Sequence, residues 1–179
     1  MTSNNQPENG KHDHFNQAEQ RVSVSEIGLS PAEQAVLNSL RLFCMSYANP
    51  GYHAWEEAFE SCAKTFGPEE GSKIGLAVMN AMRSLRQTRM TCFSFTNPGC
   101  PCCRHKLAKH EHQFMSLLKA VQDGDGLARQ ANAVILCEGV SSNKFLTHME
   151  ELAGHLSALA PGREKSASTA PRQRMKFSG

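Results

Sequence analysis

Residues 30–47, SPAEQAVLNSLRLFCMSY, predict the fold of this chain more clearly than any other stretch. They begin with Ser30-Pro31-Ala32-Glu33, where a serine cap, a proline at the first helical position and a glutamate at the third form a helix-start box. Apolar side chains then recur at steps of three and four residues, the spacing of one buried helix face: Val36, Leu37, Leu40, Phe43, Cys44 and Tyr47. Asn49-Pro50-Gly51 breaks the pattern. The stretch is therefore an amphipathic helix that needs partners to cover its apolar face.

The same helical period recurs along the chain to about residue 159. A second helix ends at Gly67-Pro68 and carries Trp55, Phe59, Cys62 and Phe66 on its predicted buried face. Further helices are predicted over about 69–88, 101–122, 127–138 and 143–159. Residues 91–96 are the one candidate for a strand. Short connections between amphipathic helices favour an antiparallel arrangement, so we predict an all-α fold, a helical bundle of about five to six helices.

The two ends of the chain differ in composition from the middle. Residues 1–29 are rich in Asn, Gln, Ser, Glu and His, and residues 161–179 are mostly Ser, Ala, Pro, Arg and Lys. Such segments bury too little apolar surface to offset the entropy of ordering, so both are predicted to be disordered tails. The C-terminal tail has five basic residues and one glutamate, a net charge of +4. Residues 30–160 form the predicted helical domain.

Composition limits the classes of function. The chain has 179 residues, 40% of them hydrophobic, and a net charge of +2, which gives no strong attraction of the whole chain to nucleic acid or membranes. No apolar run approaches the roughly 20 residues that span a bilayer, and residues 1–20 contain no apolar signal segment. We therefore expect a cytoplasmic protein with a protein partner. The basic tail could also contact nucleic acid, although a solubilising role is favoured.

The most informative stretch for function is Asn97-Pro98-Gly99-Cys100-Pro101-Cys102-Cys103, which holds three of the seven cysteines. In a reducing compartment, such a cluster indicates metal or redox chemistry rather than a disulfide framework. Pro101 at a first helical position would place Cys100 at the cap and the other two thiols in the first turn. There the helix dipole would favour the thiolates that bind metal.

Two further residues complete the predicted ligand set. Cys103, Leu107 and His110 would share one helix face, so His110 is a candidate ligand. Cys92 lies eight residues before Cys100 and can fold back across the intervening turn. The predicted metal ligands are therefore Cys100, Cys102, Cys103, Cys92 and His110, more than the four that a structural zinc ion takes.

Several chemistries fit these thiols. Zinc is favoured because it is the commoner structural solution and a histidine is at hand, and an iron–sulfur cluster is the alternative cofactor. The Cys100-Pro101 dipeptide occurs in haem-regulatory segments, but such short matches arise by chance and haem is not predicted. Cys100 and Cys103 also form a CxxC pair, which would suit a thiol-dependent enzyme. The remaining alternative is a metal-free helical interaction module in which the cysteines pack as small apolar residues.

Two other patterns carry expectations. Arg83, Arg86 and Arg89 recur every three residues, and we expect a solvated face that suits the helix C-terminus; the alternatives are an anion contact or cations near the thiols. Cys44, Cys62 and Cys137 lie on apolar stretches and are predicted core residues. Together these patterns predict a non-enzymatic regulator or adaptor whose cysteine centre is structural or senses metal or oxidant.

Overall fold

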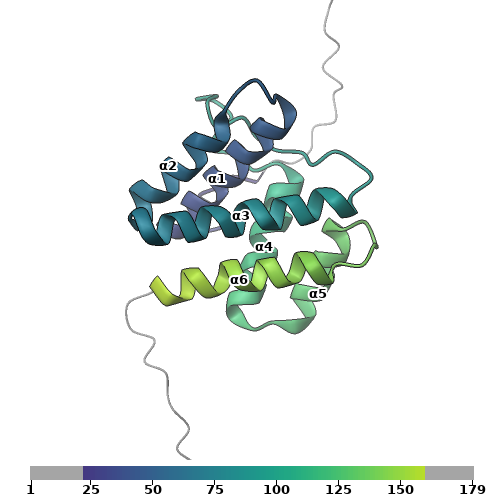
Figure 1. The fold of residues 1–179 in the computed structure, drawn as a ribbon. Helices are drawn as coiled ribbons and strands as arrows, with labels where there is room; N and C mark the ends of the chain where they lie inside the picture. The colour runs from purple at the N-terminus through teal and green to yellow at the C-terminus, as the bar shows by residue number, and fades with distance from the viewer. Residues whose placement is uncertain (1–21, 160–179) are drawn as a thin grey trace, which may run out of the picture.

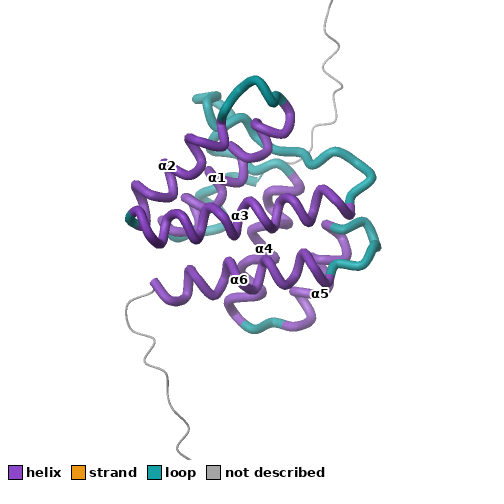
Figure 2. The backbone as a smooth tube through the Cα atoms, viewed as in Figure 1, coloured by secondary structure: helices purple, strands orange, loops and turns teal. Residues whose placement is uncertain are grey.

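The structure is a computed structural model that describes residues 22–159. Residues 1–21 of the predicted N-terminal tail and all of the predicted C-terminal tail, residues 161–179, lie outside the described residues. Within 22–159 the chain forms helices and no strand (Figures 1 and 2). The helices are α1 (Pro31–Ala48), α2 (Ala54–Phe66), α3 (Pro68–Thr88), α4 (Lys109–Asp123), α5 (Gly126–Leu136) and α6 (Asn143–Leu159). The all-α prediction is confirmed.

The helices form two groups that meet along α3 and α6. Helices α1, α2 and α3 pack against one another, and α4 packs against both α5 and α6. Helix α3 runs beside α6, as Figure 1 shows, and this contact joins the two groups. Helix α5 packs chiefly against α4. No helix of residues 22–159 is long and apolar enough to cross a membrane.

Helix α1 begins as its sequence predicts. The hydroxyl of Ser30 accepts the backbone N–H of Glu33 at 3.2 Å, and the Glu33 carboxylate accepts the backbone N–H of Ser30 at 2.8 Å. This exchange satisfies two of the donors that a helix start leaves unpaired. The predicted apolar face is buried from Val36 to Cys44, and Tyr47 at its end is half-buried.

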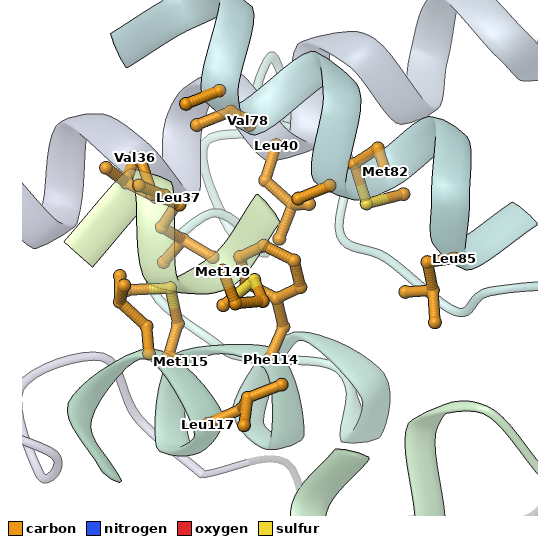
Figure 3. Close-up of a cluster of buried hydrophobic side chains, with 14 of the residues drawn as sticks. Val36, Leu37, Leu40, Val78, Met82, Leu85, Phe114, Met115, Leu117 and Met149 are labelled. Carbon is orange, nitrogen blue, oxygen red and sulfur yellow. The ribbon is translucent and has the colours of Figure 1, made fainter. Parts of the chain in front are cut away.

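The core lies where α1, α3, α4 and α6 meet. Figure 3 shows side chains of all four helices converging there, among them Leu40, Met82, Phe114 and Met149. All four are almost fully buried. Cys44, Cys62 and Cys137 are buried as well, as predicted for core residues.

The predicted face of α2 is wrong at one residue. Trp55 is half exposed, whereas Ala54, Ala58 and Cys62 form the buried line. Small side chains suit this line because it lies against α1: the Ser39 hydroxyl donates to Ala58 O at 3.4 Å and lies 3.0 Å from the Cys62 sulfur. An indole on this face would hold the helices apart.

The predicted start of the fourth helix is also wrong. Helix α4 begins at Lys109 rather than near Pro101, and residues 101–105 form turns. The backbone groups that a helix would need are used elsewhere: Arg41 takes the carbonyls of Arg104 and Lys106, and Leu107 N–H donates to Val22 O at 2.8 Å. Cys100 is therefore not a helix cap.

The compact part begins earlier than residue 30. Val24 N–H donates to His105 O at 2.9 Å, and Ser23 forms an isolated antiparallel bridge with Lys106. Ile27 and Leu29 then pack, partly buried, against the core. Residues 22–29, which composition assigned to a tail, are ordered beside the cysteine stretch.

Candidate metal centre

The connection between α3 and α4, residues 89–108, carries the cysteine cluster, and a buried ion pair fixes its second half. Arg41 on α1 donates to both carboxylate oxygens of Glu111 on α4, through Nε at 2.8 Å and Nη2 at 3.0 Å. The two side chains are 5% and 0% exposed. A bidentate pair of this kind is both strong and directional.

The remaining hydrogen-bonding capacity of this pair is directed at the loop backbone. Glu111 accepts the N–H groups of Thr96 and Ala108, at 2.9 and 2.8 Å. Arg41 donates to the carbonyls of Arg104 and Lys106, each at 2.8 Å. We call residues 97–107 the cysteine loop. The residues that flank it, Thr96 and Ala108, are both hydrogen-bonded to the Glu111 carboxylate, which therefore fixes both ends of the loop.

A second arginine–glutamate pair fixes the first half of the connection. Arg89 donates to Leu136 O at 2.6 Å and to Thr91 Oγ1 at 2.9 Å, and lies 3.0 Å from the Glu138 carboxylate. Its side chain is only 4% exposed. The prediction that Arg89 belongs to a solvated face is therefore wrong, although Arg83 and Arg86 are exposed as expected.

Glu138 completes this second pair. It accepts the backbone N–H of Met90 at 2.7 Å and the hydroxyl and N–H of Thr91. The hydrogen bond from the Thr91 hydroxyl, followed by that from Met90, holds the pKa of Glu138 below its ordinary value. The carboxylate thus stays charged at neutral pH and anchors the end of α3 to the turn after α5.

His110 lies with the second pair rather than with the thiols. Its Nδ1 accepts the backbone N–H of Ser94 at 2.8 Å, and its Nε2 lies 3.1 Å from Nη2 of Arg89. The ring also packs beside Phe93, with the centroids 5.4 Å apart. Both ring nitrogens therefore face the 89–94 segment.

The structure brings three of the five predicted ligands together. The Sγ atoms of Cys100 and Cys102 are 3.1 Å apart, and those of Cys102 and Cys103 are 3.6 Å apart. All three sulfurs lie within 4.8 Å of one another, and this is the one group of at least three such ligands found in residues 22–159. Cys92 is exposed and, like His110, is not part of the group.

Consecutive turns bring the thiols to one point. Gly99 N–H donates to the Asn97 side chain at 2.8 Å, which closes the turn that precedes Cys100. The carbonyl of Cys100 then accepts the N–H groups of Cys103 and Arg104, at 3.2 and 3.0 Å. The predicted turn chemistry is present, but it leads into a second turn instead of a helix.

The thiols influence one another's ionisation. Hydrogen bonds with Cys102 and Cys103 lower the pKa of Cys100 to about 7. Hydrogen bonding with Cys100 and Cys102 raises the pKa of Cys103 to about 11. Cys100 therefore has a lower pKa than Cys103.

The donor set suits a thiophilic ion. Sulfur ligands of a tetrahedral zinc ion lie about 2.3 Å from the metal and hence about 3.8 Å apart. The Cys102–Cys103 separation of 3.6 Å is close to this value, and the Cys100–Cys102 separation of 3.1 Å is shorter. Cys102 is exposed and the other two thiols are half-buried, so the group faces solvent. An ion held by these three sulfurs would keep one coordination position open.

Comparison with protein-family models, curated proteins and solved structures finds no match to this chain. Its function must therefore be argued from the residues themselves.

Sequence reasoning missed the two residues that hold the site, Arg41 and Glu111. Arg41 interrupts an apolar stripe, and Glu111 stands four residues before Met115 on what resembles a polar helix start. One sign was present, because Glu111 is the third residue of α4, where a glutamate accepts the N–H of the capping residue. Nothing in the spacing reveals that the two charges meet.

Proposed function

We propose that this protein is a metal-binding helical regulator or adaptor that holds one zinc ion through Cys100, Cys102 and Cys103. The observation that carries the proposal is the convergence of three sulfurs within 4.8 Å on a loop whose two ends are fixed by a buried ion pair. Thiolates are ligands that zinc prefers, and a loop held in place in advance loses little entropy when the metal binds.

The Arg41–Glu111 pair that holds the cysteine loop favours a role in sensing metal over a purely structural role for the zinc ion. Structural zinc sites supply much of the folding energy of the domains that contain them. Here the Arg41–Glu111 pair and the helical core already position the loop. Loss of metal would therefore alter the charge and shape of an exposed surface while the helices stay folded.

The open coordination position supports a role in partner binding. The described residues contribute three thiols, and a structural zinc ion takes four ligands. An iron–sulfur cluster also takes four thiolates, and no histidine or carboxylate joins the group in the described part of the chain. A protein partner that completes the site would bind only the metal-loaded form.

Thiol redox chemistry is the second candidate. The 3.1 Å separation of the Cys100 and Cys102 sulfurs favours it, because adjacent thiols can be oxidised together. Hydrogen peroxide would take two electrons and two protons from the pair: the S–S bond forms, the O–O bond of the peroxide breaks, and two water molecules are released. The loop would then sense oxidants.

Metal analysis of the full chain tests the proposal directly. We expect about one zinc per chain after purification without air, little zinc in Cys102→Ser, and normal zinc in Cys92→Ser. Cys92 is the matched control because it is also exposed and lies outside the thiol group. Chelation should leave the helical circular dichroism signal unchanged.

The other outcomes separate the alternatives. Equal metal content in the two variants, or no binding when zinc is added, would exclude zinc at these thiols. Iron with acid-labile sulfide would replace zinc by an iron–sulfur cluster. Metal-free protein that forms a disulfide with peroxide only when Cys100 and Cys102 are both present would favour the redox candidate.

A further inference from the structure

A cavity of about 350 Å³ lies between the ends of α1 and α3 and residues 90–95. Tyr47 and Cys44 come from α1, Met82 and Arg86 from α3, and Phe93 and Phe95 from the connection. The cysteine triad does not line it. An engineered cavity of about 150 Å³ holds one benzene molecule, so this volume suits a molecule of about two fused rings.

The inner wall of the cavity is apolar. Met82 is 1% exposed and Cys44 is 5% exposed, and the two phenylalanine rings are partly buried against the core. Burial raises the pKa of the Cys44 thiol, which therefore stays neutral and behaves as a small apolar group. This wall can take an aromatic or aliphatic body away from water.

The charge on the lining is entirely positive. Arg86 and Arg89 line the cavity, and no aspartate or glutamate does. Arg89 is already engaged by Glu138 and Leu136 O. Arg86 forms no ion pair with any carboxylate of residues 22–159.

Arg86 is held in a position that suits an anion. Its guanidinium lies over the Tyr47 ring, 3.9 Å from the centroid. A guanidinium stacked in this way keeps its N–H donors in its own plane, where they can reach a carboxylate through two parallel hydrogen bonds. The side chain is thus partly ordered before any ligand arrives, which reduces the entropy lost on binding.

We propose that this cavity binds a small amphipathic carboxylate, with its apolar body against Met82 and Phe93 and its carboxylate on Arg86. The proposal depends neither on Cys100, Cys102 and Cys103 nor on a metal. The connection between α3 and α4 would then contribute to two sites: residues of the 90–95 segment line the cavity, and Cys100, Cys102 and Cys103 form the metal site. A ligand here would contact residues 90–95 directly.

Binding of 2-naphthoate to the full chain, followed by its fluorescence and by calorimetry, tests the proposal. We expect saturable binding of one molecule per chain and at least about tenfold weaker binding of the uncharged 2-naphthamide, since a hydrogen-bonded charge pair is replaced by a neutral contact. Equal affinity for both compounds, or no saturation, would overturn the proposal.

Two matched variants place the site. Arg86→Gln should weaken 2-naphthoate binding about tenfold, whereas Arg83→Gln, which removes an exposed charge one turn away outside the lining, should leave it unchanged. Ala48→Phe should reduce the affinity for both compounds because Ala48 lines the cavity. Equal effects of the two arginine variants would show attraction to net charge only. Cys102→Ser should bind 2-naphthoate normally, which separates this test from that of the metal site.

Discussion

Two arginine–glutamate pairs hold the same connection between α3 and α4, and they differ in how far they exclude water. In the pair at the cysteine loop, Arg41 and Glu111 are 5% and 0% exposed. In the other pair Arg89 is 4% exposed, but Glu138 is 23% exposed. The first pair joins α1 to α4 through the core, whereas the second joins the end of α3 to the turn after α5 near the surface.

The difference shows what each pair can do. A fully buried pair is costly to desolvate, so its value depends on complete hydrogen bonding. Arg41 and Glu111 meet that condition by binding four backbone groups of the connection. Their pairing therefore specifies the path of the cysteine loop. In the second pair, Glu138 can exchange hydrogen bonds with water, so the pair depends less on its buried partners.

Breaking the buried pair should have the largest effect on stability. Arg41→Met leaves the Glu111 carboxylate buried without its counter-charge and frees two loop carbonyls, so we expect a loss of about 3–5 kcal/mol. Urea unfolding followed by circular dichroism measures it. A loss below about 1 kcal/mol would mean that water reaches Glu111 and that the pair does not define the loop.

The matched change in the second pair should cost less. Arg89→Met removes hydrogen bonds to Leu136 O and Thr91 together with the ion pair, but Glu138 can turn to solvent. We expect a loss of about 2 kcal/mol in the same urea experiment. An effect equal to that of Arg41→Met would remove the contrast between the two pairs.

Much of the fold follows from local sequence, whereas the site does not. The apolar stripe of α1, the Ser30–Glu33 box and the glycine and proline breaks act over a few residues, and each has the predicted result. The turn predicted before Cys100 is present as well, and the thiols that follow it lie close together. These features depend on contacts between residues a few positions apart, and the spacing of residue types along the sequence is enough to predict such contacts.

The false start of α4 shows why the rest could not be predicted. The segment after Pro101 has a helical pattern, but its carbonyls bond to Arg41, about 60 residues earlier in the chain. Val22 competes for the same segment. A helical pattern of apolar residues gives no information about hydrogen bonds to residues so distant in the sequence. The contact of His110 with Ser94, in place of the thiols, could not be predicted for the same reason.

The contribution of the Arg89–Glu138 pair to stability should decrease in acid. The pKa of Glu138 is lower in the folded protein than its ordinary value of 4.5, so its stabilising effect is complete above that pH and is lost as the pH falls below it. Stability of the native protein should therefore fall more steeply below about pH 4.5 than that of Glu138→Gln. Parallel curves from urea unfolding at several pH values would show that Glu138 is not held as a charged acceptor.

The smallest effect on stability is expected from the thiols themselves. Cys102 is exposed and donates no hydrogen bond to the frame of the loop, so Cys102→Ser should change the unfolding free energy by less than about 0.5 kcal/mol. The measurement is made on metal-free protein in urea with a reductant present, and Cys92→Ser serves as the control. A loss as large as that of Arg89→Met would mean that the thiol cluster itself builds the loop. The expected result would mean that Arg41 and Glu111 determine the shape of the loop, so that the cysteines are not needed for folding and can bind metal or be oxidised.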